Sequence, residues 1–186
     1  MKVKDFFKLL MVYILLFLAG VVLYVLGLRS GAFDGIPVFF YRGIAAIIAA
    51  GIIISFIMIV LRSVRMKKII TIRDILLLFC LFCCINIVIF THLPVTADRS
   101  VSVFMLGYMD NKGSDCTKQE LEDVFVQKYV REYKAFDKRL AEQLYTGTIE
   151  VTADGSYILT EPGRRIIDIY ETVADLFKID KKLIDP

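Results

Sequence analysis

The sequence predicts a membrane protein in which three transmembrane α-helices precede a small soluble α+β domain. Hydrophobic residues make up 57% of the 186 positions, against about 45–50% in an average soluble protein. Residues 1–97 carry 10 basic and 3 acidic side chains, whereas residues 98–186 carry 13 and 17. The first part also holds three long uncharged runs. We therefore expect a membrane anchor at 1–97 and a folded, slightly acidic domain at 98–186.

The expected membrane spans cover residues 9–28, 38–61 and 74–93. The first of them, Leu9 to Leu28, has no charge over 20 residues, and about 20 apolar residues cross the hydrocarbon core of a bilayer. A secretory signal peptide is the alternative interpretation. Its apolar core would be about 7–15 residues long and would end at a small-residue cleavage site. Because this run is longer and ends in Gly27-Leu28-Arg29, we expect it to be retained.

The second and third spans contain residues that suit helix packing in lipid. Small side chains on one side of the second span allow two helix backbones to approach closely, and a buried amide in the third span usually finds a partner across a helix interface. The small-residue face could pack within its own bundle or against another subunit. The candidate packing residues are Gly43, Ala46, Ala50 and Asn86.

The segment Arg62–Arg73 predicts the orientation of the anchor in the membrane. It carries five cations and no anion between two apolar runs, and the N-terminal lead adds three lysines. Positive charge in short loops marks the cytoplasmic side of a membrane. We therefore expect a bacterial-type plasma membrane protein with a cytoplasmic N-terminus and an extracytoplasmic C-terminal domain.

The second part of the chain predicts three helices, a β-hairpin and a final helix. The first helix covers about residues 98–111, and the second follows Thr117-Lys118-Gln119-Glu120, a capping-box sequence. In the third helix, at about residues 133–145, the spacing of Phe136, Leu140 and Leu144 places them on one face, which we expect to point inward. Asp154-Gly155 then separates two β-prone runs, a strong hairpin signal.

Two segments in this order of elements resemble winged-helix domains. Residues 139–150 resemble the end of the third helix of such a domain as it enters the wing. Residues 157–163 are similar to the Tyr-x-Leu-Thr-x-x-Gly pattern that closes the wing in many bacterial members. The resemblance covers about residues 100–178 and implies a winged-helix-like fold, in which DNA binding is the most common function.

The charges in the matching elements do not favour DNA, which requires cations on the third helix and the wing. The third helix offers three cations, interspersed with three acidic residues, and the wing tip between Thr152 and Ser156 has no cation and one anion. A nucleic-acid partner is therefore not expected. Such folds also serve as protein-interaction modules, because a fold does not fix a function.

The sequence contains no recognisable catalytic set, cofactor motif or metal motif. Its single histidine, His92, lies at the edge of the third span, and three of the four cysteines lie inside an apolar run. A group of polar residues lies near the span ends expected on the outer side. These residues could form local salt bridges, or could contact a lipid phosphate or a partner's carboxylate. They are Asp34, Arg42, His92, Asp98 and Arg99.

We therefore expect no enzyme and no cofactor, but a non-catalytic integral membrane subunit or scaffold. Its partners would be membrane lipids and another integral membrane protein, in an envelope assembly that handles lipid-linked glycans. The first alternative is a membrane-tethered winged-helix transcription regulator, which would require the opposite orientation. The second alternative is a small lipid-modifying enzyme that works through His92 and Asp98.

Overall fold

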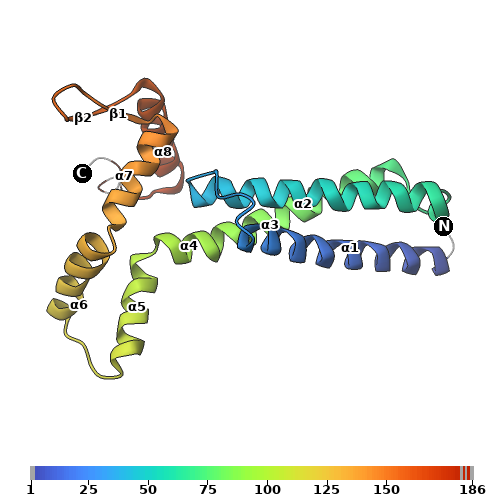
Figure 1. Ribbon diagram of the computed structural model, residues 1–186, viewed down its shortest axis with the longest axis horizontal. Coiled ribbons are helices and arrows are strands. Elements are labelled where there is room, and N and C mark those ends of the chain that lie inside the picture. Colours follow the sequence, from blue (N-terminus) through green and yellow to red (C-terminus); the bar gives the residue numbers. More distant parts are fainter. Residues whose placement is uncertain (1–2, 181, 183, 185–186) are drawn as a thin grey trace. The chain divides into compact units, whose positions relative to one another are not determined.

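The computed structural model describes residues 3–180, 182 and 184, and the chain divides into two compact units (Figure 1). The first unit is Met1–Leu106 and the second is Gly107–Pro186. The described residues are mostly helical, with one two-stranded sheet. The division falls within helix α5 (Val101–Lys112), later along the chain than the boundary expected at residue 98.

The first unit contains three helices that are long and apolar enough to cross a membrane. They are α1 (Val3–Arg29), α2 (Phe39–Leu61) and α3 (Ile72–His92). Three such helices indicate a membrane protein, so this part of the sequence prediction is confirmed. The helix α1 begins before the uncharged run because its lysines, which are good helix formers, extend it toward the N-terminus.

Two short elements extend the membrane helices. A π-helical turn, η1 (Arg62–Met66), continues α2 directly. After Leu93, the short helix α4 (Pro94–Arg99) follows α3. Proline suits this position because the first residue of a helix has no intrahelical partner for an N–H group.

The core of the first unit is built from phenylalanine rings of α3 that lie on glycines of α1 and α2. A Cβ atom added to Gly20 would lie 2.6 Å from the Phe82 ring, and one added to Gly43 would overlap the Phe90 ring. Phe82 and Phe90 are almost fully buried. Small residues thus permit the close helix approach that van der Waals packing in lipid requires.

The turn between α2 and α3 is folded, although four cations lie in it and a fifth, Arg73, follows in α3. Arg62 Nε donates to the carbonyl oxygen of Ile70 at 3.1 Å, and Ile70 is completely buried. Thr71 and Asp74 form a reciprocal capping box at the start of α3. The hydroxyl of Tyr13, in α1, donates to the Asp74 carbonyl oxygen at 2.7 Å. The turn is therefore held by hydrogen bonds of its own, and Tyr13 ties the start of α3 to α1.

The second unit follows the expected order of helices, hairpin and final helix. Thr117 caps the helix that begins at Lys118 by accepting a hydrogen bond from the Glu120 N–H. Gly147 ends the helix before the hairpin in a left-handed conformation. The strands pair antiparallel with Ile149 opposite Leu159. The elements are α6 (Lys118–Val124), π-helical η2 (Phe125–Glu132), α7 (Ala135–Thr146), β1 (Ile149–Val151), β2 (Tyr157–Leu159) and α8 (Glu161–Phe177).

Candidate functional site

Arg42 and Asp34, two of the polar residues expected at the outer membrane edge, lie together in the structure. Arg42 Nη1 lies 2.9 Å from Asp34 Oδ1, and Arg42 Nε donates to the Ile36 carbonyl oxygen at 3.0 Å. These contacts fold the connector between α1 and α2 back onto the first turn of α2. The arginine is thus occupied by its own connector, so contact with an external phosphate would compete with these interactions.

The other three residues of that group lie at the end of α3 and in α4. His92 is exposed, and its Nδ1 lies 2.9 Å from the Val88 carbonyl oxygen, so this nitrogen is used within α3. Asp98 is half-buried and Arg99 is exposed, and both interact with other groups of the chain.

The candidate packing residues lie within the bundle. Gly43, Ala46 and Ala50 are buried in the chain itself, where rings and side chains of α3 cover part of their face. Asn86 is also buried, and its amide donates to the Phe82 carbonyl oxygen at 2.8 Å, one turn earlier in α3. The small-residue face of α2 is therefore occupied by the first unit and is not a free surface for another subunit.

In the described part of the chain, no group of three or more His, Cys, Asp or Glu side chains is placed to hold a metal ion. The described residues of the second unit do contain one polar cluster. Tyr108 donates to Glu120 Oε1 at 2.8 Å, and Lys112 Nζ lies 2.6 Å from the same oxygen. The bond from Lys112 lowers the pKa of Glu120, and the Glu120 carboxylate raises the pKa of Lys112. This cluster clamps α5 to α6.

The second unit buries very little apolar surface. Among its described residues, Ala174 is the one hydrophobic side chain in the buried core. The other buried residues there are Glu142, Thr148 and Gly163. A unit of this length normally encloses a hydrophobic core, because burial of apolar side chains must offset the conformational entropy lost on folding.

The inward face expected for the third helix is wrong for two of its three residues. Phe136 and Leu144 of α7 are exposed, and Leu140 is half-buried. The spacing of these residues does predict a helix, which α7 forms, but it does not show whether other side chains cover the face they share. In the described part of the second unit, no layer of side chains covers the α7 face that carries Phe136 and Leu144.

The helix α8 carries five exposed large apolar side chains. Gly163 and Ala174 mark its covered side, where Gly163 lies against the Thr148 carbonyl group of the hairpin. On the adjoining side, apolar residues recur at spacings of three, four and seven and form one continuous helix face. We call these residues the α8 apolar face: Ile166, Ile169, Tyr170, Leu176 and Phe177, exposed by between 41% and 73%.

The hairpin next to α8 is also exposed. All three residues of β2 are exposed, including Tyr157 and Leu159, and Val151 of β1 is half exposed. A two-stranded hairpin is marginally stable by itself in water. The α8 apolar face and the hairpin therefore form the candidate interaction site of the second unit. The sequence indicates the apolar stripe of α8, but it does not show that the stripe is uncovered.

Comparisons with known proteins add no functional assignment. No protein-family model matches the chain, and the searches of curated proteins and of solved structures find no match either.

Proposed function

We propose that this chain is a non-catalytic integral membrane subunit that binds a partner protein through the α8 apolar face. The proposal rests on two observations about the described residues of the second unit: α8 has a continuous exposed apolar face, whereas the core contains a single buried hydrophobic side chain. Burial of apolar surface stabilises by about 25 cal/mol per Å². A partner that covers α8 would therefore supply the burial that the second unit lacks.

The charges of α8 favour a protein, and not a lipid surface, as the partner that covers its apolar face. Helices that lie on membranes carry lysine and arginine on their polar side. In α8 the polar positions carry four acidic residues, Glu161, Asp168, Glu171 and Asp175, and two basic residues, Arg164 and Arg165. Anionic lipids would repel a helix with this excess of negative charge. A groove in a protein with basic residues along its rim fits it better, in the manner of an amphipathic helix that docks into a hydrophobic groove.

The three membrane helices would hold this interaction site at the bilayer, so we propose that the partner is itself an integral membrane protein. The cations of residues 62–73 favour a cytoplasmic position for that turn and an extracytoplasmic position for the second unit. The order of helices and hairpin agrees with a winged-helix-like module used for protein contact. We further propose that the assembly belongs to the cell envelope and handles lipid-linked glycans, which stays a prediction.

The hairpin tip gives no support to the alternative of DNA binding. Its one charged side chain is Asp154, whose pKa is lowered by hydrogen bonds from Thr152 and Ser156. The carboxylate is therefore ionised at neutral pH and would repel a phosphate backbone. In α7, Arg139 is paired with Glu142 at 2.6 Å.

Photo-crosslinking of the full-length chain in its native membranes tests the proposal. A photoreactive residue is placed at Ile169 or at Leu176, and at Asp168 or Glu171 as matched polar positions on the same helix. We expect both apolar positions to give an adduct with the same protein, and the polar positions to give none. Adducts with lipid alone, or with another part of the same chain, would show that a different surface covers α8.

Co-expression of the identified protein with the chain then provides a quantitative test. We expect Ile169→Asp to reduce its co-purification in mild detergent by about tenfold or more, since a charge in a buried apolar contact costs several kcal/mol. The control Asp168→Ala should leave co-purification unchanged. Equal recovery with both variants would contradict a contact through the α8 apolar face.

A further inference from the structure

A cavity lies at the end of the helix bundle where α1 begins and α2 ends. Its volume is about 720 Å³, within the range of about 300–1,000 Å³ typical of ligand sites. The walls come from the first turns of α1, from the end of α2 and η1, and from the turn that follows. Its lining residues are Lys4, Phe7, Lys8, Met11, Val12, Leu61, Arg65, Met66 and Ile69.

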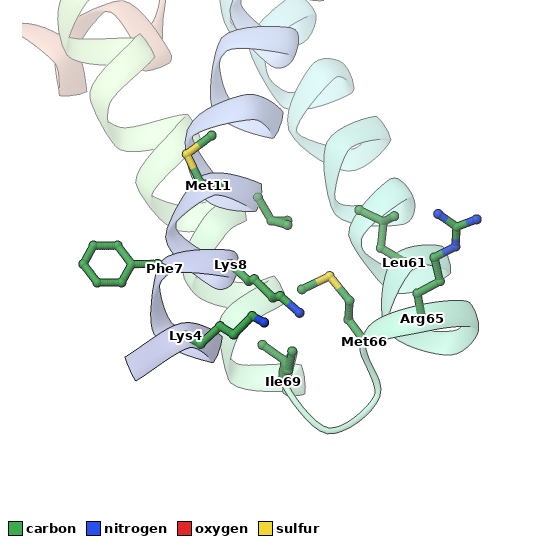
Figure 2. Close-up of a pocket in the computed structure, with 9 residues that line it drawn as sticks. Lys4, Phe7, Lys8, Met11, Leu61, Arg65, Met66 and Ile69 are labelled. Carbon is green, nitrogen blue, oxygen red and sulfur yellow. The ribbon is translucent and has the colours of Figure 1, made fainter. Parts of the chain in front are cut away.

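This lining combines an apolar wall with cations and contains no acidic residue. Figure 2 shows the Lys8 side chain directed from α1 toward Met66, with Lys4 beside it, and Arg65 at the opposite rim. The structure gives these three cations no hydrogen bond or ion pair with any residue it describes. These three cations therefore have no ion-pair partner among the described residues, although Asp5 lies in the adjoining hollow that Arg65 also lines.

The walls of the cavity are held in place by the fold. The hydrogen bond from Arg62 to Ile70 fixes the turn that carries Arg65 and Met66. The capping box at Thr71 begins α3, and Tyr13 ties that start to α1. The two sides of the opening therefore keep a defined spacing, as a binding site requires.

We propose that this cavity binds an anionic phospholipid of the surrounding bilayer, with its phosphate between Lys4 and Lys8 and an acyl chain along Phe7 and Met11. Lys8 directly precedes the uncharged run of α1 and Lys4 lies one turn earlier, which suits the level of lipid headgroups. Lysine and arginine bind phosphate through charge-assisted hydrogen bonds, and basic pockets between membrane helices bind anionic headgroups. The exposed side chains of Phe7 and Met11 supply the apolar wall that a lipid needs and a free phosphate does not.

This site differs from the outer-edge residues in which the sequence suggested a lipid-phosphate contact. There, Arg42 is already paired with Asp34, whereas no such partner occupies Lys4 or Lys8 among the described residues. The proposal does not depend on the α8 apolar face or on its partner.

Lys67 and Lys68 provide a matched control for a charge effect that is not specific to the cavity. They lie in the same turn but do not line the cavity itself. They line an adjoining hollow that shares Arg65, Met66 and Ile69 with the cavity and also contains Asp5. The variants Lys4→Gln/Lys8→Gln and Lys67→Gln/Lys68→Gln remove the same charge at exposed positions and leave the core unchanged.

The test is native mass spectrometry of the full-length chain in a neutral detergent, with three probes. Phosphatidylglycerol supplies an anionic head and chains, phosphatidylcholine supplies the same chains with a zwitterionic head, and inorganic phosphate supplies the anion alone. We expect one phosphatidylglycerol to bind in preference to the other probes. Lys4→Gln/Lys8→Gln should weaken its binding by about tenfold or more, because each basic residue near a lipid surface contributes about 1 kcal/mol. Lys67→Gln/Lys68→Gln should change it by less than about threefold.

Three results would overturn the proposal. Equal losses in the two double variants would show diffuse attraction by the whole basic end. Equal binding of phosphatidylcholine would show that the cations do not select the headgroup. Inorganic phosphate that binds as tightly as phosphatidylglycerol would show that the apolar wall takes no part.

Discussion

The bundle and the second unit contain similar apolar side chains but use them differently. In the bundle, phenylalanines of α3 are pressed onto glycines of its neighbours, so that Phe82 and Phe90 are almost fully buried. In α8, Leu176 and Phe177 are 73% and 69% exposed. Many side chains on the outside of the bundle are exposed as well, but there a lipid bilayer is the solvent. The α8 apolar face belongs to the second unit, outside the three membrane helices, and our proposal is that a partner protein covers it.

Truncation of one large side chain in each region should show the largest contrast. We expect Phe82→Ala to destabilise the bundle by about 3 kcal/mol, because it removes a buried ring that packs on Gly20 and Phe17. Leu176→Ala in α8 should change stability by less than about 0.5 kcal/mol when the chain is purified alone. Unfolding of each variant in detergent micelles measures both effects. Similar losses would mean that α8 is packed in a core of its own.

Addition of a methyl group to a glycine gives the next contrast. The variant Gly43→Ala should destabilise by about 2 kcal/mol, since its Cβ would overlap the buried Phe90 ring. At Gly107, within α5, nothing lies within 4 Å of an added Cβ. Gly107→Ala should therefore be neutral or stabilise by about 0.5–1 kcal/mol, because alanine favours the helix. The same unfolding assay compares them, and a destabilising Gly107→Ala would reveal a packed surface on α5.

The clamp between α5 and α6 should depend on pH in two directions. The pKa of Glu120 is lowered by Lys112. The stability that the ionised carboxylate gives the clamp is therefore fully present above the ordinary pKa near 4.5, and it is lost as the pH falls through the lowered pKa. The pKa of Lys112 is raised by Glu120. The stability that the protonated amine gives the clamp is therefore fully present below the ordinary pKa near 10.5, and it is lost as the pH rises through the raised pKa.

Amide exchange of α5 and α6 as a function of pH measures this clamp, after correction for intrinsic exchange rates. Glu120→Gln should remove the change at acid pH, whereas Glu122→Gln, which removes an exposed pair with Lys118, should leave it in place. If amide exchange in Glu120→Gln still changed at acid pH as in the unmodified chain, another group would have to hold the two helices together.

The ion pair in the connector should show the smallest effect. Asp34→Asn should cost about 0.5 kcal/mol, as expected for a pair near the surface. Arg42→Gln should cost more than Asp34→Asn, because Arg42 also donates to the Ile36 carbonyl oxygen. The comparison is made in the bundle unfolding assay at low salt. A reversed order would argue against the second contact.

The sequence predicts the membrane helices well because their signal is local. An uncharged run such as Leu9–Leu28 has one stable solution in lipid, a helix that satisfies its own backbone. The hairpin signal at Asp154-Gly155 is equally local, and the strands form where it indicates. The division into units is less local, so the boundary expected at residue 98 differs from the one found within α5.

Burial and site geometry require three-dimensional contacts that a sequence pattern does not contain. The spacing of Phe136 and Leu144 predicts a helix face, but not that the face is exposed. In the sequence, the basic residues near Lys4 and Arg65 indicate only the orientation of the helices in the membrane. Only the folded turn from Arg62 to Asp74 places them around one cavity.

Hydrogen exchange of the purified full-length chain tests most directly whether the second unit lacks a core of its own. Amides in the middle of α3 and of α8 are followed together by mass spectrometry in one detergent sample, so each sample contains its own reference. With no partner present, we expect amides of α8 to exchange at least about 100-fold faster than those of α3, because local opening is easy where few apolar contacts are buried. Equal protection of α8 and α3 would show that the second unit is stable by itself, and would contradict the need for a partner.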